Sequence, residues 1–281
     1  MSKKTAILLG IGLFVVALAI ALAVWLAWNA GSENIDDARP PATTGSGLVI
    51  ATWNVRGYPE KTPEAQAWFT RQVNALDATV MCIQEIATED KVRQFSTTEA
   101  FPTVAFTDSS DGQDNAVFAS GSVTITDLPD PTGFQHPAQA AFIEYEGFDA
   151  TIVNVHLSWT DKDKRADEKR LLRDVVAEAL LRDPDVIVVG DFNTPARAID
   201  ELALAVGLEV MVPEGQDGIG TTYAGNRYDH FLISPDLASE EAVSARIVTF
   251  PEEDRTIART VSDHVPVVAR FRTDMTFRDR P

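Results

Sequence analysis

The chain has 281 residues, of which 45% are apolar and 23% are charged, a composition that excludes a mainly disordered or collagen-like protein. Its single cysteine, Cys82, excludes an internal disulfide framework and a cysteine-rich zinc site. Outside Lys3 and Lys4 the chain has 22 basic and 42 acidic residues, a balance of −20, so no net attraction to nucleic acid or anionic lipid is expected. A polyanionic substrate would need a local basic patch or a bound cation.

An uncharged segment near the N-terminus predicts a membrane anchor. Residues 5–28 would form a helix of about 36 Å, which exceeds the roughly 30 Å of a hydrocarbon core. Trp25 and Trp28 lie at its far end, lysines precede it and acidic residues follow it, so residues 1–4 are expected in the cytoplasm. The alternative is a secretory signal cleaved near residues 21–23, which would release the domain. Both interpretations place the domain on the periplasmic or extracellular side.

A single α/β domain is predicted after the anchor. Residues 29–47 have the composition of a flexible linker, the domain is expected over 48–273, and 274–281 form a C-terminal tail. Helices are predicted at 63–76 and 163–181, and a third begins with Thr194 as N-cap and Pro195 at its first position and ends at Gly207. Apolar runs predict strands at 48–53, at a run ending at 85, and at 115–119, 123–126, 140–145, 151–156, 186–189, 228–233 and 265–271.

Polar side chains stand where several predicted strands stop. These residues are Asn54, Glu85, His156, Asp191, Asn193, Asp229, Asp263 and His264. Because ligands of α/β proteins gather beside strand ends, the side chains are expected to converge. Carboxylate and amide oxygens suit Mg²⁺, with Mn²⁺ or Ca²⁺ as alternatives, and histidines near acids suit proton transfer. The pattern indicates metal-assisted hydrolysis by an activated water.

Six ordered motifs resemble the endonuclease/exonuclease/phosphatase superfamily, which has the DNase I-like fold. The motifs are TWNVRG (52–57), CIQE (82–85), NVHL (154–157), GDFNTP (190–195), YDHFLIS (228–234) and SDHVPV (262–267). The resemblance implies an α/β four-layer sandwich of two facing mixed β-sheets flanked by helices. It also implies that Glu85 is the main metal-binding carboxylate, that Asn54 supports the metal, and that Asp263 is a further acid on the metal side.

The resemblance implies catalytic roles for five other residues. Asp191 and Asn193 would position the attacking water and the phosphate. His264 would contact the scissile phosphate, with Asp229 orienting its ring. His156 matches a second histidine of deoxyribonuclease-like and sphingomyelinase-like members, whereas abasic-site endonucleases carry a tyrosine in that region.

Simpler interpretations exist for several of these residues. Asp191 and Asn193 could cap the helix that follows them, and His156 could be a core histidine. His230 follows Asp229 on its strand, so it is expected to face the opposite surface and to be structural.

The segment 162–173 contains six basic residues and follows His156. It could be the patch that meets a polyanion, but interleaved acidic residues favour a solvated helix face. Arg56 could contact phosphate or form a salt bridge. Trp159 and Phe134 are the only aromatic residues of the predicted loops that merit consideration for substrate contact.

The expected function is a membrane-anchored, metal-dependent phosphodiester hydrolase. The pair His156 and His264 favours a nuclease that acts on nucleic acid. The alternative is a phosphatase or a lipid phosphodiesterase, of the sphingomyelinase-like or inositol-phosphate type, which the anchor and the negative charge favour. A non-catalytic binding module is disfavoured by the intact set of acids and histidines, and no protein partner can be inferred.

Overall fold

The computed structural model describes most of the predicted domain. The described residues are 47–273, except 59–61, 89, 91, 93–94, 96–99, 108–111 and 217. The predicted anchor at 5–28 and the tail at 274–281 lie outside them. Among the described residues, no helix has the length and apolar character needed to span a membrane.

One six-stranded sheet carries the first half of the predicted site. Its strand order is β11-β12-β1-β2-β4-β3, in which β1 and β2 are parallel and the other neighbours are antiparallel. The strands are β1 (Gly47–Tyr58), β2 (Val80–Ile86), β3 (Thr103–Thr107), β4 (Asp114–Ala119), β11 (Ala242–Ile247) and β12 (Val267–Arg272). Strand β1 begins one residue before the predicted strand, because Gly47 already pairs with Arg272.

A second six-stranded sheet carries the other half. Its order is β5-β6-β7-β8-β10-β9, in which only β7 and β8 are parallel neighbours. The strands are β5 (Thr124–Asp127), β6 (His136–Tyr145), β7 (Phe148–His156), β8 (Val186–Asp191), β9 (Glu209–Val210) and β10 (Asp229–Ile233).

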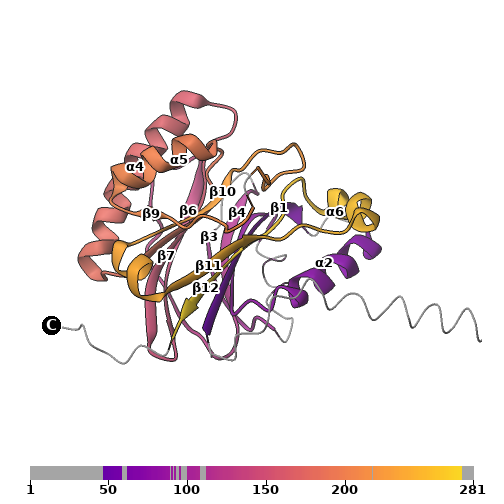
Figure 1. The fold of residues 1–281 in the computed structure, drawn as a ribbon, viewed down its shortest axis with the longest axis horizontal. Coiled ribbons are helices and arrows are strands. Elements are labelled where there is room, and N and C mark those ends of the chain that lie inside the picture. Colours follow the sequence, from indigo (N-terminus) through magenta and orange to yellow (C-terminus); the bar gives the residue numbers. More distant parts are fainter. Residues whose placement is uncertain are drawn as a thin grey trace, which may run out of the picture. The chain divides into compact units, whose positions relative to one another are not determined.

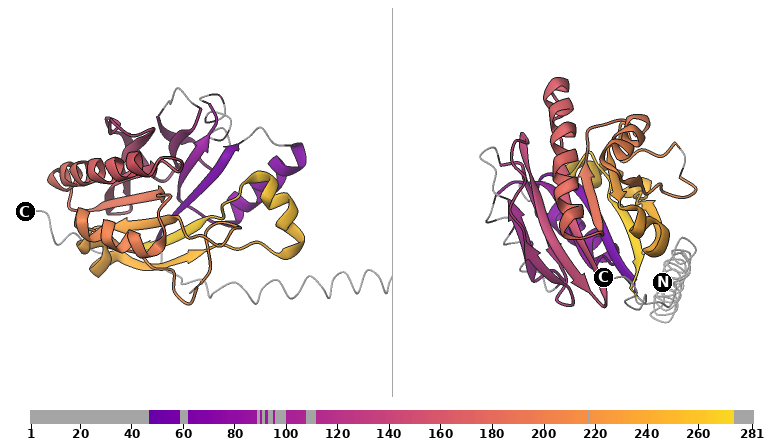
Figure 2. Two further views of the ribbon diagram at one scale, coloured as in Figure 1. Left: turned by 90° about the horizontal axis from the view of Figure 1, so that it is seen from above. Right: turned by 90° about the vertical axis from the view of Figure 1, so that its left-hand side faces the viewer.

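Helices cover the outer face of each sheet. Figures 1 and 2 show α4 (Lys162–Arg182) and α5 (Ala196–Val206) together on one side, with α2 (Pro63–Ala75) and α6 (Arg255–Val261) on the other. Three apolar clusters separate these layers. One lies between the sheets, one joins α2 and α6 to the first sheet, and one joins α4 and α5 to the second. The expectation of two mixed sheets flanked by helices is confirmed.

Successive strand residues fill different clusters. Cys82 packs between the sheets, whereas Met81 and Ile83 pack toward the helices. Because both faces of such a strand are buried, its sequence is a continuous apolar run rather than an alternating one. Cys82 is fully buried, as expected, and burial raises the pKa of its thiol.

The predicted strands and helices are all present, but some elements were missed. Strands β3 and β11 lie at the edges of the first sheet and are only partly buried, so their apolar pattern is weak. The prediction for the start of α5 was wrong. Pro195 is the N-cap residue, no side chain caps the helix, and the Thr194 hydroxyl donates instead to the Phe192 carbonyl at 2.8 Å. Gly207 ends the helix with φ 77°, as predicted.

Gly190 permits the close approach of two strands next to the predicted site. It has φ +131°, and a Cβ built on it would lie 2.1 Å from the Val155 carbonyl oxygen of β7. A side chain there would separate β7 from β8, the pair in which His156 faces Asp191. The glycine of the GDFN motif is therefore a packing requirement.

We expect Gly190→Ala to lower the free energy of unfolding by at least about 3 kcal/mol or to prevent folding, because overpacking and positive φ act together. Gly207→Ala is the control, since it has φ +77° but no atom within 4 Å of the added Cβ. That control should cost about 1 kcal/mol. Urea denaturation of the two variants measures the difference, and equal costs would disprove the packing explanation.

Candidate active site

Irregular backbone at the ends of β1 and β2 places two polar side chains in the site. The β1–β2 register shifts between Asn54 and Tyr58, and the β2–β4 register shifts between Ile83 and Ile86. Glu85 has φ 56°, an uncommon value for a residue with a side chain. Such bulges redirect side chains at the edge of a functional site. Here the Asn54 amide nitrogen donates to Glu85 Oε1 at 2.9 Å.

The second sheet contributes His156 and Asp191 from neighbouring strands. The two residues are paired in the β7–β8 register. Asp191 Oδ1 accepts from the backbone N–H of Asn193 at 2.8 Å. The side-chain Nδ2 of Asn193 donates to the Leu157 carbonyl at 2.9 Å. Asn193 itself has φ 46°. The alternative that Asp191 and Asn193 cap α5 is not supported, because the helix has no side-chain cap.

Side chains from the two sheets meet at Asp191. Asn54 Nδ2 donates to Asp191 Oδ2 at 3.1 Å. His156 Nε2 lies 3.6 Å from Glu85 Oε1 and 3.8 Å from Asp191 Oδ2. The Asn54 amide oxygen accepts from the Arg56 backbone N–H at 3.0 Å, so the nitrogen faces the carboxylates. In this orientation Asn54 donates hydrogen bonds to the carboxylates of Glu85 and Asp191. Its predicted support of a metal would therefore be indirect, through the position of Glu85.

The loop that carries His264 is fixed to strand β1. The Trp53 indole N–H donates to the His264 carbonyl at 3.1 Å. The Ser262 hydroxyl donates to the Asn54 carbonyl at 2.6 Å and accepts from the His264 amide N–H at 3.0 Å. These bonds explain why tryptophan and serine stand beside the functional residues in the TWN and SDH motifs.

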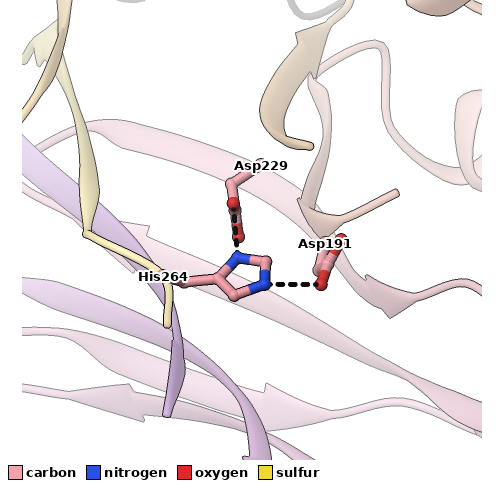
Figure 3. A group of neighbouring side chains, drawn as sticks. All are labelled: Asp191, Asp229 and His264. Carbon is pink, nitrogen blue, oxygen red and sulfur yellow. Dashed lines mark hydrogen bonds and ion pairs between the residues drawn. The ribbon is translucent and has the colours of Figure 1, made fainter. Parts of the chain in front are cut away.

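The His264 ring lies between two carboxylates. Its Nδ1 is 2.8 Å from Asp229 Oδ2 and its Nε2 is 3.5 Å from Asp191 Oδ2 (Figure 3). Burial alone disfavours the charged ring, but the charge and hydrogen bond of Asp229, with the charges of Asp191 and Asp263, raise the pKa of His264 to about 10. At neutral pH the ring is therefore an imidazolium that holds a proton on each nitrogen.

Asp191, Asp229 and His264 form a buried group that could bind a metal, since one ligand atom from each lies within 4.8 Å of the others. Within this group, however, Asp229 Oδ2 and His264 Nδ1 already engage each other at 2.8 Å. The oxygens that face Asn54 and His156, from Glu85 and Asp191, are better suited to a hard cation.

The charges around the cleft leave a negative excess. The four carboxyl groups are those of Glu85, Asp191, Asp229 and Asp263, and the formal positive charges opposite them are Arg56 and protonated His264. Leaving His156 aside, the balance is −2. The donor set and this charge both fit a divalent cation.

Asp263 lies at the rim of the site rather than in its floor. Its carboxylate is 3.8 Å from Arg56 Nε, and both side chains are 59% exposed. The salt-bridge interpretation of Arg56 is therefore supported. A cleft of about 390 Å³ opens here, lined by Arg56, Glu85, Gln113, His156, Trp159, Asp191, Asn193, Thr222, Ala224, Asn226, Tyr228, Asp263 and His264.

Two buried residues that support the site, Gln84 and Asn154, were not singled out in the sequence, whereas His136 was expected to be structural, with substrate contact as the alternative. Gln84 Nε2 donates to Asn154 Oδ1 at 2.7 Å, which joins β2 to β7 directly behind Glu85 and His156. The His136 ring stacks on His156 with centroids 4.6 Å apart and an interplanar angle of 15°. The available signal for Gln84 and Asn154 was a polar residue within an apolar run, one position before Glu85 and two positions before His156.

His230 is structural, as predicted. It is buried on the face opposite Asp229, where its Nε2 lies 3.1 Å from the Arg227 carbonyl and its ring contacts Phe192. Burial lowers the pKa of His230 to about 4, so the ring is neutral at pH 7.

The basic segment 162–173 belongs to α4 and interacts mainly with its own surroundings. Lys164 Nζ donates to the Gly133 carbonyl at 2.7 Å, and Arg170 pairs with Asp167. Lys169 is half-buried, and burial lowers the pKa of its ammonium. These contacts support the interpretation as a helix face rather than a polyanion patch.

Comparisons with known proteins identify the family and agree with this fold. The model of the Endonuclease/Exonuclease/phosphatase family matches residues 51–264. This chain belongs to that family. No curated protein matches the chain in sequence.

Solved structures share the fold at low sequence identity. Zebrafish (D. rerio) TDP2, complexed with a single-strand DNA product, has a TM-score of 0.63 and 18% identity over 80% of this chain and 99% of its own. The endonuclease domain of TRAS1, a telomere-specific non-LTR retrotransposon, has a TM-score of 0.59 and 15% identity over 82% and 100%. The human Nocturnin catalytic domain has a TM-score of 0.60 and 15% identity over 80% and 94%.

The raised pKa of His264 predicts a pH dependence of stability. Because the folded value of about 10 exceeds the ordinary 6.5, the His264–Asp229 interaction stabilises the fold fully below pH 6.5 and is lost as the pH rises through 10. We expect Asp229→Asn to lower the pKa of His264, measured by NMR titration of the ring. The buried ring of His230 is the internal reference, and an unchanged His264 titration would refute the assignment of Asp229 as the cause.

Proposed function

We propose that this domain is a metal-dependent hydrolase that cleaves phosphodiester bonds in nucleic acid. The observation that carries the proposal is the convergence of Glu85, His156, Asp191 and His264 on one cleft from two different sheets. The nucleic-acid substrate is supported by two relatives, one complexed with single-strand DNA and the other an endonuclease domain. The histidine at position 156 of the NVHL motif, together with His264, supports the same substrate class.

In this proposal Asp191 activates the attacking water. Its Oδ2 is held by Asn54 and lies beside the imidazolium of His264, so the carboxylate is fixed in orientation before substrate binds. The oxygen accepts the proton that the water loses as the new P–O bond forms, while the bond between phosphorus and the leaving oxygen breaks and that oxygen takes up a proton from solvent. His264 Nε2–H and the Asn193 side chain then face the phosphate oxygens, where they stabilise the charge of the transition state.

Glu85 would hold the metal, with Asp191 beside it and Asp263 at the rim. When bound, a divalent cation such as Mg²⁺ supplies charge neutralisation at a phosphate oxygen. Asn54 keeps the Glu85 and Asp191 carboxylates together, and Gln84 and Asn154 fix the strands that carry Glu85 and His156.

Removing either central side chain should abolish hydrolysis. We expect Asp191→Ala and His264→Ala to lower kcat by at least about a thousandfold, because each removes proton transfer or charge stabilisation. His230→Gln is the matched control and should keep activity, since that ring lies on the opposite face. Turnover of a labelled oligonucleotide gives the rates, and near wild-type turnover in either site variant would contradict the roles assigned.

Metal removal should stop the reaction reversibly. We expect EDTA to abolish hydrolysis and added Mg²⁺ or Mn²⁺ to restore it, because the cleft has an excess of negative charge that a cation must offset. The assay uses the full-length chain in detergent with plasmid DNA, RNA, sphingomyelin and inositol phosphates in parallel. Full activity in metal-free buffer, or hydrolysis of the non-nucleic substrates alone, would reject the proposal.

A further inference from the structure

An exposed tryptophan stands at the rim of the catalytic cleft. Trp159 is 63% exposed and lines the same cleft as Glu85, Asp191 and His264. The other large apolar side chains that are exposed among the described residues are aliphatic and lie elsewhere: Leu181, Leu204, Val212 and Val243. An indole left in water beside a polar site is a candidate for contact with substrate.

The backbone beneath Trp159 is fixed by the start of α4. Arg165 Nη1 donates to the carbonyls of Ser158 and Trp159 at 2.6 and 3.2 Å. The fully buried Glu168 accepts from the Ser158 amide N–H and from the Gln135 amide N–H, both at 2.7 Å. Two charged side chains thus hold the turn that presents the indole, and a ring on a fixed turn loses little freedom on binding.

The same turn is connected to the catalytic residues. The Leu157 amide N–H donates to the Asp191 carbonyl at 2.9 Å, and the Leu157 carbonyl accepts from Asn193 Nδ2 at 2.9 Å. These hydrogen bonds therefore fix the turn that carries Trp159 at a defined position relative to Asp191.

Stacking would supply affinity that the charge of this protein does not. The chain has a net charge of −18, and Arg165 and Lys164 of the basic segment are engaged with backbone carbonyls. An aromatic face binds a nucleobase without attracting phosphate charge, and it accepts any base that is not already stacked in a duplex.

Resting on the proposed function, we propose that Trp159 is a stacking subsite for an unpaired nucleobase beside the scissile phosphate. The substrate is then single-stranded or locally unpaired nucleic acid. A lipid surface is disfavoured as the occupant, because Leu181 lies at the opposite end of the 21-residue α4 and, among the residues that the structure describes, no other large exposed apolar side chain lines the cleft with Trp159.

The test compares two oligonucleotides of equal length and charge, one with bases and one built of abasic tetrahydrofuran units, cleaved by the full-length chain. We expect Trp159→Ala to raise KM for the base-bearing strand roughly five- to a hundredfold and to change KM for the abasic strand less than about twofold. Since the stack is present in both the bound and transition states, kcat should stay within about twofold. Trp159→Phe should restore most of the affinity, whereas Trp159→Leu should not.

Leu204→Ala, which removes an even more exposed apolar side chain outside the cleft, is the control and should change neither KM. Equal losses on both strands, or no loss on either, would overturn the stacking subsite while leaving the proposed function intact. A loss confined to hydrolysis of sphingomyelin vesicles would also overturn it and assign Trp159 to lipid. Failure of the wild-type chain to cleave any strand would instead reject the proposed function itself.

Discussion

The site depends on one carboxylate. Asp191 Oδ2 is 3.1 Å from the Asn54 amide nitrogen, 3.5 Å from His264 Nε2 and 3.8 Å from His156 Nε2, while Oδ1 accepts from the Asn193 amide N–H at 2.8 Å. Asn54 belongs to one sheet and Asp191 to the other, so this carboxylate connects both halves of the domain. Its burial beside the carboxylate of Asp229 is offset by the N–H groups of Asn54 and Asn193 and by the ring of His264.

The fold accepts backbone strain in order to build this arrangement. Among the described residues, three of the five non-glycine residues with positive φ are Arg56, Glu85 and Asn193, which all line the cleft. Such conformations persist only where surrounding structure holds them. Here the surroundings are central strands whose two faces are buried, together with the close β7–β8 approach that Gly190 permits.

The composition of the start of α4 suggests a patch that binds a polyanion, but its charged residues have a structural role instead. Its acidic and basic side chains bind backbone groups of the adjoining turns, so charge is used to fix a loop. The loop in turn carries the aromatic ring at the cleft. A run of basic residues in this sequence therefore does not by itself indicate a basic surface. Lys164 and Arg165, which bind backbone carbonyls, are not available in that form to attract a polyanion.

The sequence by itself determined the apolar strands, the polar residues at their ends, the placement of His230 on the strand face opposite Asp229 and the end of α5 at Gly207. These features follow from local rules of burial, side-chain alternation and turn geometry. Only the tertiary structure decided that the Asn54 nitrogen faces Asp191, 137 residues away, that His136 stacks on His156, and that β3 and β11 form edges. Contacts between distant segments depend on how two sheets pack face to face, and no local pattern in the chain records that packing.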